Sequence, residues 1–136
     1  MGLGNLQLSF LNTKLYDNEN DNSNVLYFSY FNFQFLLMGD ASKKRESDIL
    51  VNYNLQNIDF LKVGHHGSNT SSSKEFISKI NPKYSLISVG KDNRYGHPKD
   101  SVLDILKDTK IYRTDINGSI EIQLKKNKYK IRTCSP

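Results

Sequence analysis

The amino-acid sequence predicts one layered α/β domain. Its middle part alternates segments with the residue pattern of strands and segments with the apolar spacing of helices, in the order strand, helix, strand, helix, strand, helix, strand. A chain of 136 residues can bury one modest core. No repeat and no second domain are visible in the sequence, so we treat residues 1–136 as one unit.

The predicted strands are short segments rich in alternating, β-branched or aromatic residues. Two of them are joined by a tight turn at Phe31 and Asn32, and Gly39 and Asp40 end the second. The polar stretch 16–24 between the first two strands predicts a loop. The predicted strands cover residues 3–11, 25–30, 33–39, 58–64, 84–90, 110–115, 119–124 and 128–132.

Three segments have the apolar spacing of helices. In one of them Phe76, Ile77 and Ile80 share a face, and Pro82 stops the helix. Near the C-terminus, Asn117-Gly118 between two predicted strands is a strong signal for a β-hairpin turn. The predicted helices cover residues 42–53, 73–80 and 100–107.

Charge and cysteine content limit the function classes. The formal charge of +5 and the pI of about 9.2 favour an anionic partner such as nucleic acid, a phosphoester or an acidic surface, although Lys-rich composition also keeps a small domain soluble. Cys134 stands alone, which excludes a disulfide framework and a Cys-based zinc knuckle within this chain. The apolar stretch 25–38 is too short and too polar to span a bilayer, and no targeting signal is visible.

Polar residues follow three predicted strands directly: Gly39-Asp40, Gly64-His65-His66-Gly67 and Tyr95-Gly96-His97-Pro98. In layered α/β folds the loops at the carboxyl ends of strands form the ligand sites. A carboxylate and up to three imidazoles then converge at one rim. These are good ligands for zinc, manganese or iron.

Two interpretations of Asp40 remain open. A carboxylate that follows a buried strand must be solvated, hydrogen-bonded or metal-bound. Asp40 also stands where it would cap the helix that begins near Ser42. Spacing alone favours the cap, and the two roles are compatible.

Adjacent His65 and His66 have different predicted roles. On extended backbone their side chains point to opposite faces, so one binds a metal and the other faces substrate or packs. The pattern Ser72-x-x-Glu75 is that of a capping box, which predicts a helix start. Free amides at that helix start would favour an anion beside the histidines. The hydroxyl groups that would join in binding this anion belong to Ser68 and Thr70.

The third histidine, His97, lies in a loop that also offers Arg94 and Tyr95. These two side chains are candidates to hold a phosphate. A turn histidine before a proline is common, so the alternative of a purely structural role stays open for His97.

The segments LLMGD, DFLKVGHHGSNTSSS, NPKYSLISVG, NRYGHP and YRTDINGSIEI occur in an order that closely resembles the C-terminal metallo-β-lactamase-like domain of ComEC-type DNA-internalisation competence proteins. The resemblance covers residues 24–122, and its HHGS and YGHP elements mark that branch of the superfamily. The same signature is similar to that of phosphorylcholine esterases and other phosphoester hydrolases.

This resemblance implies an αββα sandwich, with a mixed sheet and flanking helices, that holds two metal ions, zinc or manganese, at one edge. The position of Asp40 is that of the carboxylate that bridges the two metals, and we match His66 to a metal ligand. His65 and His97 would then face the substrate and stabilise charge on a phosphoryl group.

The chain lacks the superfamily's His-x-His-x-Asp-His element, because no histidine precedes His65. Two metals need about seven or eight protein ligands, more than Asp40 and the three histidines provide. The resemblance therefore covers only the second half of the sandwich. The chain is then expected to be a piece of a longer protein, a split gene product or a degenerate remnant, and to be inactive as a binuclear hydrolase on its own.

Two functions follow as expectations. One is part of a metal-dependent phosphodiesterase or nuclease that acts in DNA uptake and needs either its missing N-terminal half or a self-associating copy. The other is a non-catalytic module that binds nucleic acid or a partner chain through basic residues at 43–45 or in the stretch KKNKYK, 125–130. The resemblance implies the extracytoplasmic face of the membrane if the chain belongs to a full-length family protein, and the cytoplasm otherwise.

Overall fold

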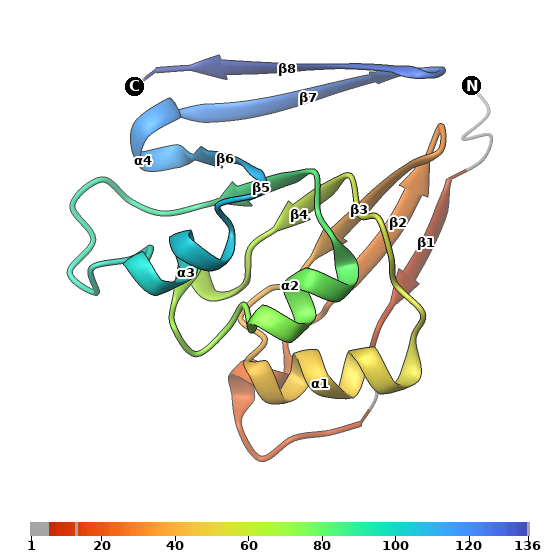
Figure 1. Cartoon of the computed structure of the whole chain (residues 1–136), viewed down its shortest axis with the longest axis vertical. Coiled ribbons are helices and arrows are strands. Elements are labelled where there is room, and N and C mark those ends of the chain that lie inside the picture. Colours follow the sequence, from red (N-terminus) through yellow and green to blue (C-terminus); the bar gives the residue numbers. More distant parts are fainter. Residues whose placement is uncertain (1–5, 13, 136) are drawn as a thin grey trace.

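The computed structural model describes residues 6–12 and 14–135 and has a mixed α/β architecture with two sheets. Figure 1 shows the larger sheet between the main helices and the smaller sheet. The predicted α/β class, with a mixed sheet and flanking helices, is confirmed.

The structure contains most of the predicted elements, usually shortened by one to three residues at an end. Residues 3–5 of the first predicted strand lie outside the described residues. The elements are β1 (Gln7–Phe10), η1 (Glu19–Asn22), β2 (Leu26–Tyr30), β3 (Phe33–Leu37), α1 (Lys43–Asn52), β4 (Phe60–Lys62), η2 (Gly64–Gly67), α2 (Lys74–Ile80), β5 (Tyr84–Ile87), α3 (Asp100–Ile105), β6 (Lys110–Arg113), α4 (Thr114–Asn117), β7 (Ser119–Lys125) and β8 (Lys128–Cys134).

The six-stranded sheet has its strands in chain order, from β1 to β6. The pairs β1–β2 and β2–β3 are antiparallel, and β3 to β6 are parallel. Helices α1, α2 and α3 connect the parallel strands. Because such crossovers are right-handed and each one here advances in the same direction, the three helices lie on the same face of the sheet (Figure 1).

The face of the sheet under the helices forms an aliphatic core. Leu36 on β3 and Leu61 on β4 pack in one cluster with Ile49 of α1, Phe76 of α2 and Val102 of α3, and each is at most 1% exposed. Burial of such side chains is the main force that holds helices on a sheet.

The opposite face carries a row of aromatic rings across neighbouring strands. Phe28, Phe35, Phe60 and Tyr84 stack in sequence with centroid separations of 4.5, 4.7 and 5.2 Å. Tyr129 of β8 lies edge-on against Phe60 at 5.4 Å and Tyr84 at 5.7 Å. The β7–β8 sheet therefore covers part of this aromatic face.

Strand β1 leaves another part of the same face exposed. Leu8 pairs with Phe28 in the ladder, so the two share a face. Leu6, Leu8 and Phe10 are 40%, 53% and 56% exposed. Neighbouring exposed apolar side chains of this kind are typical of a surface that binds another protein segment.

The predicted hairpin at Asn117-Gly118 is wrong. The flanking strands belong to different sheets, because β6 pairs in parallel with β5. Residues Thr114–Asn117 form a helical turn instead, and Gly118 ends it with φ of 68° and ψ of −142°. The C-terminal hairpin joins β7 to β8, and its turn residue Asn127 has a positive φ.

No helix within residues 6–12 and 14–135 has the length and apolar character needed to cross a membrane.

Candidate functional site

The carboxyl ends of the parallel strands bring the three histidines together. His65 and His66 follow β4, and His97 lies in the loop after β5. The His65 ring centroid lies 6.4 Å from that of His66 and 6.0 Å from that of His97. Parallel neighbouring strands end at one edge of the sheet, which is why residues distant in sequence meet there.

The two adjacent histidines lie in a tight turn, η2, and not on extended backbone as the sequence suggested. Both have left-handed backbone angles, with φ of 46° at His65 and 55° at His66. Each such residue costs about 1–2 kcal/mol of backbone strain. The amide of His65 donates to the carbonyl of Gly39 at 2.9 Å, which ties this turn to the end of β3.

Gly67 closes the same turn against the loop of His97. It has φ of +82°, and a Cβ on Gly67 would lie 2.5 Å from Cβ of Pro98. The amide of Lys99 donates to the Gly67 carbonyl at 2.9 Å. A side chain at position 67 would therefore push His97 away from the other two histidines.

His66 has the hydrogen bonding of a metal-ligand histidine. Its Nδ1 lies 2.6 Å from the carbonyl oxygen of Ser88. Because a carbonyl only accepts, Nδ1 is the donor, and in the neutral ring Nε2 then keeps its lone pair. A backbone carbonyl on the other ring nitrogen is the usual support of an imidazole that binds a metal.

His65 is oriented by two hydroxyl groups. Its Nδ1 lies 3.3 Å from Oγ1 of Thr70, which lies 3.0 Å from Oγ of Ser68. Ser68 is only 5% exposed and also accepts from the amide of Thr70. The described contacts of Ser68 and Thr70 thus position His65, and their predicted contact with an anion stays a prediction.

The predicted capping box at the start of α2 is wrong. The N-cap is Ser73, whose Oγ accepts from the amide of Phe76 at 3.2 Å. The buried carboxylate of Glu46 on α1 accepts from the amides of Ser72 at 2.5 Å and Ser73 at 2.8 Å. These amides are therefore not free to bind an anion. Desolvation raises the pKa of Glu46 above its usual value.

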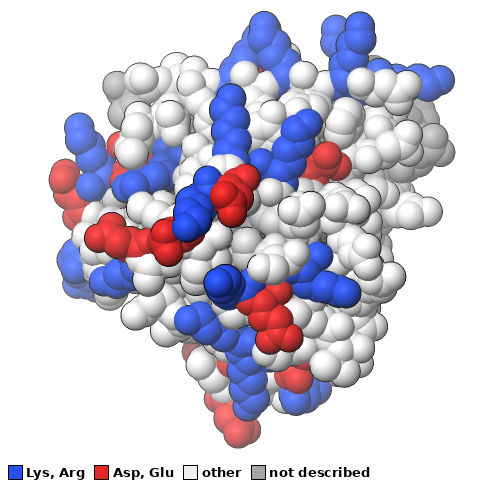
Figure 2. Space-filling model, viewed as in Figure 1, with Lys and Arg blue, Asp and Glu red and all other residues white. Residues whose placement is uncertain are grey.

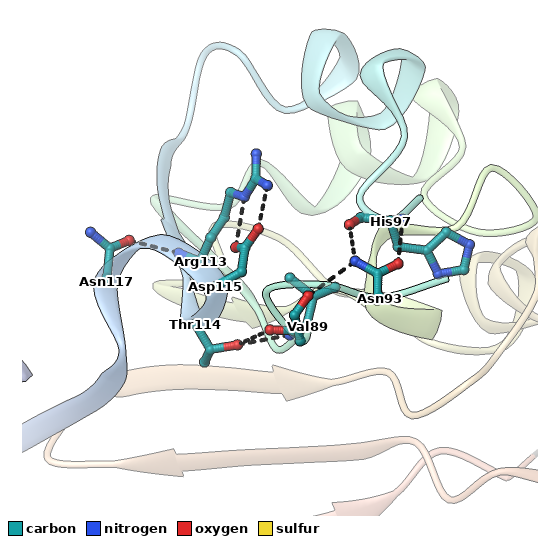
Figure 3. A network of polar contacts seen from close by, with 8 residues as sticks. Val89, Asn93, His97, Arg113, Thr114, Asp115 and Asn117 are labelled. Carbon is teal, nitrogen blue, oxygen red and sulfur yellow. Dashed lines mark hydrogen bonds and ion pairs between the residues drawn. The ribbon is translucent and has the colours of Figure 1, made fainter. Parts of the chain in front are cut away.

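A polar network holds the loop of His97 in place (Figure 3). The side chain of Asn93 accepts from the amide of His97 at 2.8 Å and donates to its carbonyl at 2.8 Å. Oγ1 of Thr114 accepts from the amide of Val89 and donates to its carbonyl, each at 2.8 Å. Burial lowers the pKa of His97, and Lys99, His65 and His66 lower it further.

Arg94 and Tyr95 lie beside His97. The guanidinium of Arg94 lies 5.1 Å from the Tyr95 ring centroid and donates to its hydroxyl at 3.0 Å. The Tyr95 ring stacks on His97 at 5.8 Å. A small cavity of about 200 Å³ is lined by residues that include His66, Tyr95 and His97. Two imidazoles and a tyrosine thus border one hollow, and the guanidinium of Arg94 lies on that tyrosine.

Asp40 is not the helix cap that spacing favoured. The N-cap of α1 is Ser42, whose amide donates to Oδ1 of Asp21 at 2.9 Å. The next amide, of Lys43, donates to the carbonyl of Thr70. Asp40 is held through its own amide, which donates to Oγ of Ser23 at 3.2 Å. Its partly buried carboxylate is therefore not used to cap α1.

The donor types fit zinc or manganese, but the number of ligands does not reach a full site. Imidazole and carboxylate are good donors for these ions. In the part of the chain that the structure describes, no three His, Cys, Asp or Glu side chains lie close enough to hold a metal ion.

Sequence reasoning missed several supporting residues. Glu46, Asn93 and Thr114 act through contacts with residues that are near in space, and only Asn93 stands close to a histidine in the sequence. Asp115 pairs with Arg113 at 2.6 Å, which lowers the pKa of this carboxyl and fixes the turn that carries Thr114. Only the spacing of Arg113 and Asp115 could have suggested this pair.

Comparison with known proteins adds independent information. Over 109 residues the chain is 39% identical to ComE operon protein 3 of Bacillus subtilis (strain 168), an alignment that covers 79% of this chain and 14% of that protein. The identity to Competence protein ComA of Neisseria gonorrhoeae is 38% over 93 residues, or 65% of this chain and 13% of that protein. The chain is a relative of competence proteins.

A further relative is Recombination protein 2 of Haemophilus influenzae, which is 32% identical over 116 residues, or 84% of this chain and 14% of that protein. The chain thus spans only a small part of the length of each of these three relatives. No family model matches it.

Proposed function

We propose that this chain forms part of a metal-dependent, phosphodiester-hydrolysing centre in a competence-related protein that acts in DNA uptake. The observation that carries the proposal is the bond between His66 Nδ1 and the Ser88 carbonyl, within a cluster of three histidines. The bond leaves Nε2 of His66 free to bind a metal. The names of the relatives support the link to competence.

In this proposal Asp40 and His66 are metal ligands within a metallo-β-lactamase-like sandwich, of which the described sheet and helices form one half. A bound zinc or manganese ion would supply Lewis-acid activation of water. His65 and His97 face the phosphoryl group. The lowered pKa of His97 keeps its imidazole neutral near pH 7, so the ring offers one N–H donor and one lone pair.

Arg94 and Tyr95 are proposed to orient the phosphate. The guanidinium of Arg94 places a permanent positive charge on the Tyr95 ring, which in turn stacks on His97, and this charge would attract a phosphoryl group. Thr70, hydrogen-bonded to His65, would share this task, and Ser68 would hold Thr70 in place.

The remaining metal ligands would come from another segment of a larger protein or from a second copy of the chain. The exposed side chains Leu6, Leu8 and Phe10, on the face opposite the helices, support such an addition. We expect the purified chain to self-associate through this face. In size-exclusion chromatography with light scattering, a Leu8→Ser/Phe10→Ser variant should then become monomeric. A wild-type chain that is already a monomer would contradict the proposed self-association.

Calorimetric titration with zinc and manganese tests the metal ligands. We expect binding that weakens at least about tenfold in His66→Ala and in Asp40→Ala, because each change removes a ligand. His97→Ala is the matched control, because it removes an imidazole that lies about as near to His65 as His66 does but has no proposed ligand role. This variant should bind metal as the wild type does. Equal affinity of wild type and His66→Ala would refute the assignment.

The alternative role, a module that binds nucleic acid without catalysis, makes a different prediction. No phosphodiester would then be cleaved when metal is restored in the presence of the completing segment.

A further inference from the structure

Most of the chain's excess positive charge lies in the C-terminal hairpin. Residues 119–134 contain the cations Lys125, Lys126, Lys128, Lys130 and Arg132 but only one carboxylate, whereas the whole chain has a formal net charge of +5. Figure 2 shows Lys and Arg side chains projecting from the upper edge of the molecule, where β7 and β8 lie in Figure 1.

The regular ladder of the hairpin sorts its residues onto two sides. Along β7 and most of β8, exposed and half-buried residues alternate. The half-buried set includes Tyr129, which packs on the six-stranded sheet. The exposed set includes four cations, which we call the basic hairpin face: Lys125, Lys128, Lys130 and Arg132.

Strand pairing places these cations in a compact array. Lys125 pairs directly with Lys128, while Lys130 and Arg132 pair with Gln123 and with the carboxylate-bearing Glu121. Along β8 the cations recur at every second residue, about 6.6 Å apart. They line a shallow hollow of about 350 Å³. Lysines directly opposite each other repel, so this array is unfavourable unless an anion lies over it.

The other basic stretch suggested by the sequence, residues 43–45, exposes only Lys43 and Lys44. Arg45 is 1% exposed, and its guanidinium donates to the carbonyl of Leu11 and to the side chain of Asn12. The expectation that Arg45 contacts phosphate is therefore wrong, because its charge is used inside the fold.

We infer that the basic hairpin face binds the phosphate backbone of nucleic acid without reading its sequence. Lysine acts on phosphate as a point charge, which suits contacts that are independent of sequence. No aromatic residue is among the exposed residues of β7 and β8, and Tyr129, which also lines the hollow, is half-buried with its ring packed on Phe60. The face therefore lacks both an exposed platform for stacking bases and the apolar anchors that a membrane-surface element inserts. A row of phosphates matches a row of cations better than a lipid surface does.

Fluorescence anisotropy with a short DNA duplex of mixed sequence tests this inference. The measurement is made in EDTA, so that failure of the proposed metal centre cannot affect it. The test variant is Lys125→Gln/Lys128→Gln/Lys130→Gln. The matched control is Lys74→Gln/Lys79→Gln/Lys107→Gln, which removes three exposed lysines from the helical side of the molecule.

Four phosphate contacts predict that the logarithm of the wild-type binding constant falls against the logarithm of salt concentration with a slope of about −3.6. The hairpin variant should bind at least about tenfold more weakly at low salt, with a slope near about −0.9. The control should keep the wild-type slope. By circular dichroism neither variant should melt below the wild type, because the substituted side chains are exposed and the opposed lysines of the hairpin repel each other.

Two results would overturn the inference. One is an equal loss of affinity and slope in both variants, which would mean that only net charge matters. The other is binding to phosphatidylserine vesicles with no binding to DNA, which would assign the face to a membrane surface. A single Lys130→Glu variant, with one side chain changed, repeats the test if the triple variant melts early.

Discussion

The histidine turn and the basic hairpin face present polar groups in opposite ways. In the turn Gly64–Gly67, two histidines have left-handed backbones, and Gly67 has no room for a side chain. The cations of β7 and β8 project from an ordinary antiparallel ladder into solvent. The histidine site therefore depends on the close fit of several loops, whereas the hairpin face depends on how many charges it carries.

The largest change in the free energy of unfolding is expected when a methyl group is added at Gly67. Gly67→Ala is expected to lower the free energy of unfolding by about 3 kcal/mol, because of the positive φ and the contact with Pro98. Denaturant unfolding measures the change. Gly90→Ala is the matched control, since a Cβ there would meet no atom within 4 Å. Equal stability of the two variants would show that the turn is not tightly fitted.

A smaller loss is expected when the support of the His97 loop is removed. Thr114→Val leaves the amide of Val89 without its partner and should lower the free energy of unfolding by about 2 kcal/mol. Thr114→Ser keeps the hydroxyl and should lose much less. A valine variant as stable as the wild type would contradict the role of these two hydrogen bonds.

A still smaller loss of stability is expected when the attachment of the C-terminal hairpin to the larger sheet is weakened. Lys83 and Tyr84 both hydrogen-bond Tyr129, whose hydroxyl lies 2.9 Å from that of Tyr84. This arrangement lowers the pKa of Tyr129 and raises the pKa of Tyr84 to about 12. Tyr129→Phe keeps the ring packing, so we expect a loss of only about 1 kcal/mol. The pKa of Tyr84 should fall toward 10.0, as an absorbance titration of tyrosine can measure. An unchanged titration would contradict the contact.

The smallest expected effect is the contribution of His97 to the pH dependence of stability. The lowered pKa of His97 means that the unfolded chain, with a histidine pKa of 6.5, takes up a proton before the folded chain does. The contribution of His97 to stability is therefore present above pH 6.5 and is lost as pH falls through its folded pKa. Unfolding of wild type and His97→Gln at neutral and mildly acidic pH measures it. The variant should lose less stability on acidification, and an identical loss would argue against burial of this ring.

Much of the fold could be predicted because local pattern and final structure agree. The apolar spacing of Phe76, Ile77 and Ile80 predicts a helix face, and all three are buried in α2. The turn at Phe31 and Asn32 was also predicted correctly, and both residues have positive φ there. In these segments propensity, periodicity and burial favour the same structure.

The wrong predictions share a physical cause, which is competition from distant residues. Asn117-Gly118 favours a hairpin locally, but parallel pairing of β6 with β5 makes the chain leave the sheet at that point. The carboxylate of Glu46 reaches amides 26 and 27 residues away and replaces the local capping box. The meeting of the three histidines at one edge of the sheet could be predicted from the strand pattern, but the left-handed backbone of His65 and His66 could not.

The most direct test of the account is a long-range proton–nitrogen NMR correlation of the three histidines, recorded before and after zinc is added. The account predicts that His66 carries a proton on Nδ1, donated to the Ser88 carbonyl, and that zinc shifts its Nε2 signal first and most strongly. A His66 ring with its proton on Nε2, or a zinc response confined to His65 or His97, would contradict the assignment of His66 as the metal ligand of this chain.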